Sequence, residues 1–325
     1  MTHVLITGGG GFLGQKLAQK LSRTGELDGQ AIQSMTLIDV IEPTPVTAPF
    51  KTRTHVIDIS DPQAVQTLFK DTFDTIYHLA AVVSGQAEAE FDVGLQVNLF
   101  GTLNMLQAAR MQDARIGRPA KFIYASSVAA HGGEVPDPVP EGAELNPQTS
   151  YGTQKAMGEL LVQDMSRRGI IDGRGLRLPT VSIRPGKANA AASSFMSSIF
   201  RDTMQGNTAN CPLGEDYRVW HTAPRTIIDN LVHTANVPAG QFGLNRNINL
   251  PGRSDTIAEM IQAMTKIAGD APATRITWNA DEDVAKIANG WRGDVKHDKA
   301  LRLGFKADRS FEDSVTWFLE DDIAT

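Results

Sequence analysis

The chain contains a single cysteine, Cys211, and this scarcity excludes an internal disulfide. A lone cysteine also excludes a cysteine-based metal cage, and it is typical of a protein kept in a reducing compartment. Nowhere do His, Cys or carboxylate residues cluster with the spacing of metal ligands. We therefore expect a cytoplasmic protein without a metal site.

Long apolar runs and an excess of basic charge are also missing. No run of about 18 apolar residues occurs, so no membrane span is predicted. The net charge is -6, and acidic and basic residues are interspersed. That pattern provides no basic face for nucleic acid or for an anionic membrane. No targeting pattern precedes the first core strand, which begins at His3 or Val4.

The clearest positive signal lies at the amino end. An apolar strand, Val4 to Ile6, is followed by Gly8, Gly11 and Gly14 and then by a helical pattern that reaches Leu21. Such a turn directs free helix N–H groups and the positive end of the helix dipole toward a pyrophosphate. Gly8 suits the tight turn, Gly11 the close approach of the phosphates, and Gly14 the packing of helix on strand. The alternative, a glycine-rich turn without a ligand, is disfavoured because the strand and the helix are both present.

Apolar strands alternate with amphipathic helices through the first half of the chain. We predict strands over 35–39, 54–59, 74–81, 121–127 and 176–183, a loop over 24–33, and helices over 13–23, from Ser60 onward, 98–111 and 151–168. This alternation is typical of an α/β protein with a Rossmann, doubly wound parallel sheet.

Three of these strands end in residues suited to a dinucleotide. Asp39 is expected to bind the adenosine ribose hydroxyls and to repel a 2′-phosphate, which favours NAD over NADP. Asp58 and Ile59 are expected near the adenine, while Ala80 and Ala81 let a cofactor come close. A solvated aspartate remains the alternative for Asp39. For the two alanines, simple packing within a buried strand is about as well supported as cofactor contact.

A tyrosine and a lysine turn the binding fold into a candidate enzyme. Tyr151 and Lys155 lie four residues apart on a predicted helix, so they share one face. That helix follows the strand that ends in Ser126 and Ser127. A Tyr-x-x-x-Lys spacing is common by chance, and its position after this strand is what makes it informative.

Several motifs together resemble the extended short-chain dehydrogenase/reductase family, which includes NAD-dependent epimerases and dehydratases. They are the glycine motif over 7–14, His78-Leu79-Ala80-Ala81, Asn98-Leu99-Phe100-Gly101-Thr102, Ser126-Ser127 and Tyr151-x-x-x-Lys155. The resemblance covers about the first 190 residues. One departure is His131-Gly132, which stands where many members have Tyr-Gly, and it makes the substrate side of the pocket harder to predict.

The resemblance implies NAD as cofactor and a separate role in the reaction for each of the site residues. Tyr151 would be the base, Lys155 would hold the nicotinamide ribose, and Ser127 or its neighbour Ser126 would bind the reacting oxygen. A tyrosine can act as a base near neutral pH only if its pKa falls from about 10. We expect Lys155 and the positive nicotinamide ring to lower it.

By resemblance, the cofactor is expected to contact Gly8, Gly11, Phe12, Leu13, Gly14, Asp39, Asp58, Ile59, Leu79, Ala80, Ala81, Asn98, Tyr151, Lys155, Leu178, Pro179 and Val181. Residues 1–185 would form the NAD-binding Rossmann domain, completed by parts of 226–255 and 296–312. Residues 186–225 with 256–295 would form a smaller C-terminal substrate lobe.

Within the family, the stretches 80–84, 150–155 and 178–187 resemble dehydrogenases of a four-carbon sugar acid, which implies oxidation at C2. The alternative is a nucleotide-sugar 4-epimerase that retains NAD. A non-catalytic NAD sensor is disfavoured because Tyr151 and Lys155 are present. A dehydratase is disfavoured because Val128-Ala129 stands where such enzymes have Asp-Glu.

The substrate is expected to meet a cation, because a small acid offers little apolar surface. We favour Arg225 for this role over Arg184, for which packing against the sheet is an equal alternative. The substrate-binding set is Ser84, Ser127, Tyr151, Arg184, Asn189 and Arg225, with Lys187, Trp220 and His221 as further candidates. His221 is more simply a packed histidine. A homodimer that pairs the helices of Asn98 and Tyr151 is common in relatives.

Overall fold

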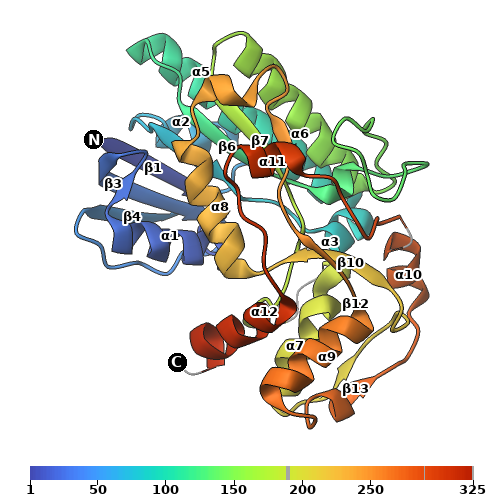
Figure 1. Cartoon of the computed structure of the whole chain (residues 1–325). Coiled ribbons are helices and arrows are strands. Elements are labelled where there is room, and N and C mark those ends of the chain that lie inside the picture. The colour runs from blue at the N-terminus through green and yellow to red at the C-terminus, as the bar shows by residue number, and fades with distance from the viewer. Residues whose placement is uncertain (188–190, 289, 324–325) are drawn as a thin grey trace.

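The computed structural model describes residues 1–187, 191–288 and 290–323. Its main sheet has the strand order β11-β7-β6-β5-β1-β3-β2, and β4 pairs with β3. The strands are β1 (Thr2–Thr7), β2 (Glu26–Leu27), β3 (Gln30–Asp39), β4 (Lys51–Val56), β5 (Thr75–His78), β6 (Lys121–Ser127), β7 (Asp172–Leu178) and β11 (Asn247–Asn249). All pairs are parallel except β2 with β3. The predicted Rossmann-like α/β fold is confirmed (Figure 1).

Helices cover both faces of this sheet, and each face has its own hydrophobic cluster. The first cluster joins α1 and α8 to the sheet, and the second joins α2, α5 and α6. The helices are α1 (Phe12–Thr24), α2 (Pro62–Leu68), α5 (Thr102–Ile116), α6 (Ser150–Arg167) and α8 (Pro224–Asn236). Because side chains alternate along a strand, Val4 and Ile6 face the first cluster while Leu5 faces the second.

Local capping explains where two of these helices begin. The Asp61 carboxylate accepts hydrogen bonds from the N–H groups of Gln63 at 2.8 Å and Ala64 at 3.3 Å. Proline follows it at the first helical position, where a missing N–H costs nothing. Thr149 caps α6 in the same way, because its hydroxyl accepts the Gly152 N–H at 3.1 Å. That cap fixes the start of the helix that carries Tyr151.

Several predicted boundaries were wrong. The predicted loop over 24–33 contains the β2–β3 hairpin, so β3 begins before residue 35. The predicted helix over 98–111 starts earlier, as the helical run α4 (Phe91–Gly94), the π-helix η1 (Leu95–Gly101) and α5. The predicted strands 54–59 and 74–81 end earlier, at Val56 and His78.

The largest departure concerns the predicted strand over 176–183. β7 starts four residues earlier and ends at Leu178, because Pro179 has no N–H to continue the ladder. After it, β8 (Thr180–Val181) joins a separate three-stranded sheet. The chain therefore leaves the main sheet earlier than predicted.

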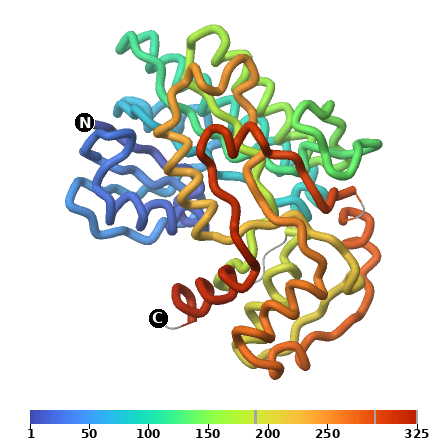
Figure 2. Tube along the Cα trace, in the orientation of Figure 1, coloured from blue at the N-terminus to red at the C-terminus, as the bar shows by residue number. Residues whose placement is uncertain are grey.

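A smaller lobe lies beside the carboxyl ends of the main strands (Figure 2). It contains β9 (Ala209–Asn210), β10 (Arg218–Thr222), β12 (Arg253–Thr256), β13 (Ile276–Thr277), α7 (Phe195–Met204), α9 (Ile257–Ala268) and α12 (Phe311–Phe318). A third hydrophobic cluster joins α7, α9 and α12. The predicted ranges omitted α12. The predicted division into an NAD-binding domain and a substrate lobe stays a prediction.

The remaining elements are short. They are α3 (Ser84–Ala89), η2 (Val128–Ala130), η3 (Ala192–Ser194), η4 (Ala239–Phe242), η5 (Ala273–Arg275), α10 (Glu282–Ala288), α11 (Asp298–Arg302) and η6 (Leu319–Ile323). Among them, α3, η2, η3 and α10 contribute to the cavity described below.

Candidate active site

The glycine turn between β1 and α1 has the geometry of a phosphate cradle. Gly8 adopts a φ of 72°, and an added Cβ there would lie 2.8 Å from the Ala80 nitrogen. A Cβ on Gly14 would collide with the Gly8 carbonyl oxygen. The helix has no side-chain cap and no acidic residue in its first turn, so its first N–H groups stay available. This turn therefore fits the pyrophosphate of NAD.

Asp39 lies directly against this turn, at the end of β3. Its Oδ2 accepts the Gly10 N–H at 2.9 Å, and its Oδ1 accepts the Val40 N–H at 2.7 Å. Asp58 accepts the Ser60 N–H at 2.8 Å, and Ile59 is buried beside it. Asp39 thus flanks the glycine turn, at the side where the adenosine of a dinucleotide binds in this fold, while Asp58 and Ile59 lie in the loop after β4.

A cavity of about 370 Å³ extends from the glycine turn to the smaller lobe. Of the predicted cofactor contacts, those that line it are Gly8, Gly11, Phe12, Leu13, Gly14, Leu79, Ala81, Tyr151, Lys155, Leu178, Pro179 and Val181. Ala80 does not line it but packs against Gly8. Asn98 is also absent from the lining, since its amide bonds to Val82 and Gln154 and so braces the loop after β5.

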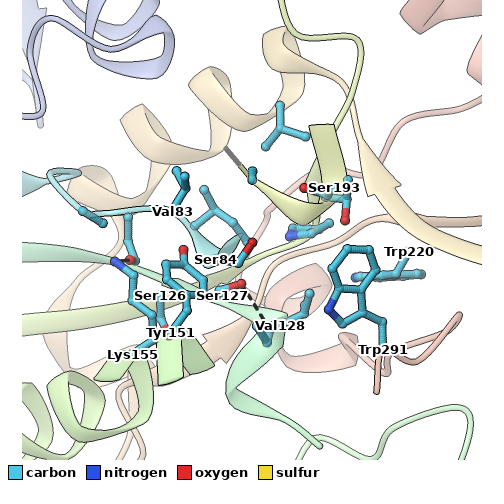
Figure 3. A pocket seen from close by; sticks show the side chains of 18 of the residues that line it. Val83, Ser84, Ser126, Ser127, Val128, Tyr151, Lys155, Ser193, Trp220 and Trp291 are labelled. Atoms are coloured by element: carbon cyan, nitrogen blue, oxygen red, sulfur yellow. Dashed lines mark hydrogen bonds between the residues drawn. The ribbon is translucent and has the colours of Figure 1, made fainter. Parts of the chain in front are cut away.

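Tyr151, Lys155 and Ser127 meet in this cavity (Figure 3). The Ser127 hydroxyl lies close enough to the Tyr151 hydroxyl to act against the rise of its pKa. The Ser127 oxygen also accepts the Ala129 N–H at 3.1 Å, which leaves its proton free to donate. The Lys155 ammonium donates to the Ala125 carbonyl at 2.8 Å and lies 5.6 Å from the Tyr151 ring centroid.

Ser126 has a different environment, although it too borders the cavity. Its hydroxyl donates to the Glu159 carboxylate at 2.5 Å, and Glu159 is paired with Arg177 at 2.6 Å. Successive side chains on a strand point to opposite sides, so only one of the two serines can face Tyr151. That residue is Ser127.

Burial controls the protonation of the tyrosine and the lysine. It raises the pKa of Tyr151 to about 12, opposed by the Ser127 hydroxyl and by the positive charge of Arg184. It also lowers the pKa of Lys155 to about 7, opposed by the negative charge of Glu159. Without the cofactor, burial therefore outweighs the groups that lower the Tyr151 pKa. The predicted lowering by Lys155 together with the positive nicotinamide ring stays a prediction.

Arg184, one of the two arginines considered for binding the substrate, lines the cavity. Its guanidinium donates to the Ser193 carbonyl at 2.8 Å and contacts the Ser193 and Ser197 hydroxyls at 3.3 and 3.4 Å. No carboxylate pairs with it among the described residues. Burial and the neighbouring charge of Arg201 lower its pKa to about 10. A largely buried cation without an anionic partner is prepared to bind an anion.

The structure does not bring Arg225, the favoured candidate, to this cavity. Its guanidinium pairs with Asp321 at 2.5 Å and with Glu320 at 2.8 Å, and it lies over the Trp317 ring. The prediction failed because these acids lie almost a hundred residues away in sequence. These two acids neutralise the positive charge of Arg225, which the prediction had assigned to the substrate.

Some of the other candidates for substrate binding line the cavity and others do not. Ser84 and Trp220 line the cavity, and the Ser84 oxygen accepts the Ala192 N–H at 3.2 Å. His221 is fully buried and bonds to Asp255 at 2.9 Å, as a packed histidine would. Lys187 is exposed and does not line the cavity. Asn189 lies outside the described residues.

Sequence reasoning missed most of the far wall of the cavity. Three of the missed lining residues come from the region after α10 and the loop after η2: Trp291, Val295 and Val139. His131, noted as a departure from the family pattern, lines the cavity and bonds to Asn249 at 3.0 Å. An isolated tryptophan in the glycine-flanked stretch 290–293 was the available signal.

Two further observations, on membrane-spanning helices and on metal-binding groups, apply to the described residues. None of the described helices combines the length and apolar character that crossing a membrane requires. Within the same residues, no group of three or more His, Cys, Asp or Glu side chains could hold a metal ion.

Known proteins resemble this chain over nearly its whole length. A D-erythronate dehydrogenase from Cupriavidus necator is 44% identical over 325 residues, covering 98% of each protein. A D-erythronate dehydrogenase from Haemophilus influenzae is 39% identical over 320 residues, covering 98% of this chain and 99% of that protein. A solved structure described as a nucleoside-diphosphate-sugar epimerase from Agrobacterium tumefaciens is 40% identical, with a TM-score of 0.94, and covers 99% of this chain and 95% of that one.

The two dehydrogenases support NAD-dependent dehydrogenase activity for this chain, with NAD as the cofactor. The model of the NAD dependent epimerase/dehydratase family matches residues 4–223, a stretch that holds the glycine turn and the Tyr151–Lys155 pair. Because of this match and the Rossmann-like sheet, we conclude that the chain belongs to the NAD dependent epimerase/dehydratase family.

Proposed function

We propose that this enzyme oxidises the C2 hydroxyl of a small sugar acid, with D-erythronate as substrate and 2-oxo-tetronate as product. The observation that carries the proposal is Arg184. This cation has no carboxylate partner among the described residues, and it lines the same cavity as Tyr151 and Ser127. The names of the two similar dehydrogenases support the four-carbon acid.

Each residue of the site would have one task in this reaction. Tyr151 takes the proton of the C2 hydroxyl, and Ser127 donates a hydrogen bond to the oxygen that reacts. Lys155 donates to the ribose hydroxyls of the cofactor while the Ala125 carbonyl holds it in place. NAD, when bound, would supply the oxidant for the hydride that leaves C2.

The free energy needed to make Tyr151 a base can be compared with the free energy that nearby positive charges supply. Lowering its pKa from about 12 to about 8 requires about 5 kcal/mol, since one pKa unit is about 1.36 kcal/mol. One positive charge about 4 Å away supplies about 4 kcal/mol at an effective dielectric constant of about 20. Tyr151 therefore needs more than one cation, so the positive ring of NAD⁺ has to act together with Lys155, and Lys155 has to keep its proton when the cofactor is bound.

The substrate carboxylate would bind Arg184. A guanidinium binds a carboxylate through two parallel hydrogen bonds, so it fixes orientation as well as charge. Arg184 lines the same cavity as Tyr151, and its positive charge acts to lower the pKa of that tyrosine. A 2-hydroxy acid carries its carboxylate next to the reacting carbon, so both groups of the substrate can lie in this one cavity.

The remaining proposed site residues would act on the cofactor. Asp39 would hold the adenosine ribose, Asp58 and Ile59 would flank the adenine, and Asn98 would act indirectly by bracing Val82. Ser84 would face the substrate from the opposite wall, since Figure 3 shows it near Ser127 and Tyr151.

The alternative function is a nucleotide-sugar 4-epimerase that retains NAD. It rests on the description of the similar Agrobacterium structure. The sugar acid is favoured over it because the two dehydrogenases named for D-erythronate are 44% and 39% identical over nearly the whole chain.

One assay separates these functions. The protein is mixed with NAD and, one at a time, with three- to six-carbon hydroxy acids and with nucleotide sugars, and the absorbance of reduced NAD is followed. Net formation of reduced NAD with D-erythronate is the expected result. Interconversion of nucleotide sugars without net reduction would instead establish the epimerase.

We also propose a homodimer, formed through the outer faces of η1 and α6. Phe100, Met157 and Leu160 are large apolar side chains that are 40%, 41% and 63% exposed on these packed elements. A second copy of this chain would cover them. Sedimentation of the protein and of a Leu160→Glu variant tests this, and we expect a dimer that the variant weakens.

A further inference from the structure

A second cavity, of about 430 Å³, lies next to the first. Its lining is Gly85, Glu88, Ala89, Ala129, His131, Gln148, Thr149, Asp283, Lys286, Ile287, Gly290 and Trp291. Six of these residues also line the first cavity: Ala129, His131, Thr149, Ile287, Gly290 and Trp291. The two cavities therefore share a wall, and Trp291 has the largest side chain in it.

The backbone on both sides of Trp291 is anchored. On one side, the Tyr217 hydroxyl donates to the Ala288 carbonyl at 2.7 Å, and the Trp291 N–H donates to that carbonyl at 2.9 Å. On the other side, the Arg292 guanidinium donates to the carbonyls of Gly133 at 2.5 Å and Val135 at 3.2 Å. The Trp291 side chain also packs against the third hydrophobic cluster, so both its backbone and its indole have neighbours that hold them.

Trp291 lies at the substrate end of the first cavity. Figure 3 shows the indoles of Trp220 and Trp291 at the end opposite Lys155. If the proposed function holds, the carboxylate is on Arg184 and C2 is at Tyr151. The tail of the acid then extends toward the remaining lining at this end, which includes Val128 and the two indoles.

We infer that Trp291 is a specificity-determining residue, which closes the substrate end of the cavity and restricts the enzyme to short sugar acids. Behind it, the second cavity is lined by polar side chains, among them Glu88, Gln148 and Lys286, which bond to neighbouring groups of the chain. Such groups can hydrogen-bond the hydroxyls of a longer chain. Removing the indole would join the cavities and admit five- and six-carbon polyhydroxy acids.

The test compares wild type with Trp291→Ala on four-, five- and six-carbon sugar acids, with saturating NAD. We expect the ratio of kcat/KM for the six-carbon acid to that for the four-carbon acid to rise at least about tenfold, because a few added carbons decide entry to a closed pocket. Trp291→Phe, which keeps a smaller ring, should give an intermediate ratio. Trp278→Ala is the matched control, since Trp278 is exposed and lines neither cavity.

A second substitution tests whether the tail uses the second cavity. Ala89 lines that cavity only, so Ala89→Phe should fill part of it and leave the wild-type preference unchanged. Combined with Trp291→Ala, it should reverse the gain on the longer acids.

The outcomes separate the two proposals. If wild type oxidises no sugar acid, the proposed function fails. If wild type oxidises the four-carbon acid but neither Trp291 variant changes the chain-length ratio, the inference about Trp291 is overturned. A gain that persists in the Ala89→Phe double variant overturns the use of the second cavity. Melting temperatures show which variants are folded, and Trp291→Phe decides the matter if Trp291→Ala is not.

Discussion

The two ends of the cavity are built in different ways. The nucleotide end comes from one continuous stretch, β1 through the start of α1, with Asp39 from the next long strand. The substrate end joins Ser84, Arg184 and Trp291, which are far apart in sequence. A local motif can be recognised from spacing alone, whereas a distributed site depends on packing that spacing does not record.

The partners of the two candidate arginines show this difference most clearly. Both Arg184 and Arg225 were candidates for binding the substrate, with packing against the sheet as an equal alternative for Arg184. In the structure Arg225 is neutralised by acids of the C-terminal segment, while Arg184 has only hydroxyl and carbonyl partners among the described residues. Which cation stays available is decided by long-range contacts.

The largest effect is expected at Tyr151, where the two ends meet. Tyr151→Phe removes only the proton acceptor, so turnover should fall by about 10² to 10⁴ while the Kd for NAD stays nearly unchanged. Steady-state kinetics and NAD titration measure both quantities. Retention of more than about a tenth of the rate would show that another group is the base.

The next effect distinguishes the substrate end from the nucleotide end. Arg184→Met should raise KM for the acid about ten- to a hundredfold, because it removes a charge-assisted pair worth about 1.5 to 3 kcal/mol. Arg184→Lys keeps the charge without the two-pronged geometry and should fall between. The Kd for NAD should hardly move in either variant. A parallel loss of NAD binding would mean that Arg184 serves the cofactor instead.

A smaller effect is expected at the nucleotide end. Asp39→Asn keeps an acceptor for the Gly10 N–H but removes the negative charge that repels a 2′-phosphate. The ratio of kcat/KM with NAD to that with NADP should therefore shrink by about tenfold, which corresponds to about 1.4 kcal/mol. Asp58→Asn is the matched control, and its ratio should not change. An unchanged ratio in Asp39→Asn would remove Asp39 from the ribose site.

The fold was predictable where the sequence signal was local. The prediction failed where charged residues are buried. The limits of β6 were predicted exactly, since its apolar run is uninterrupted up to Ser126. The start of β7 was missed because Arg174 does not read as a buried residue. It is buried because its guanidinium donates to the Thr234 carbonyl at 2.5 Å and also pairs with Asp172. Only the folded chain brings Thr234 to Arg174.

The same reason explains what could be said of the site. The Tyr151–Lys155 face and the glycine turn follow from helix and turn geometry, so their residues could be named. Trp291 and Val139 line the cavity only because α10 and the loop after η2 fold over it. No period or spacing in the sequence connects those segments to the glycine turn.

The smallest effect is expected at Arg225, and it tests the corrected placement. Arg225→Met should leave KM for both substrates within about twofold of wild type, because the side chain does not line the cavity. Its pairs with Asp321 and Glu320 are partly exposed, so the variant should lose about 1 kcal/mol of stability or less. Thermal unfolding at two salt concentrations measures this, and the difference from wild type should shrink at high salt.

The pH dependence of that stability difference identifies its cause. The guanidinium of Arg225 holds the pKa of Asp321 below its ordinary value. The unfolded chain therefore takes up a proton there at a higher pH than the folded one. The stabilisation is fully present above the ordinary carboxyl pKa and is lost as pH falls through the lowered one. Wild type and Arg225→Met should accordingly differ at neutral pH and converge in acid. A difference that persists in acid would mean that Arg225 acts through its packing on Trp317, while a raised KM for the acid would return Arg225 to the substrate site.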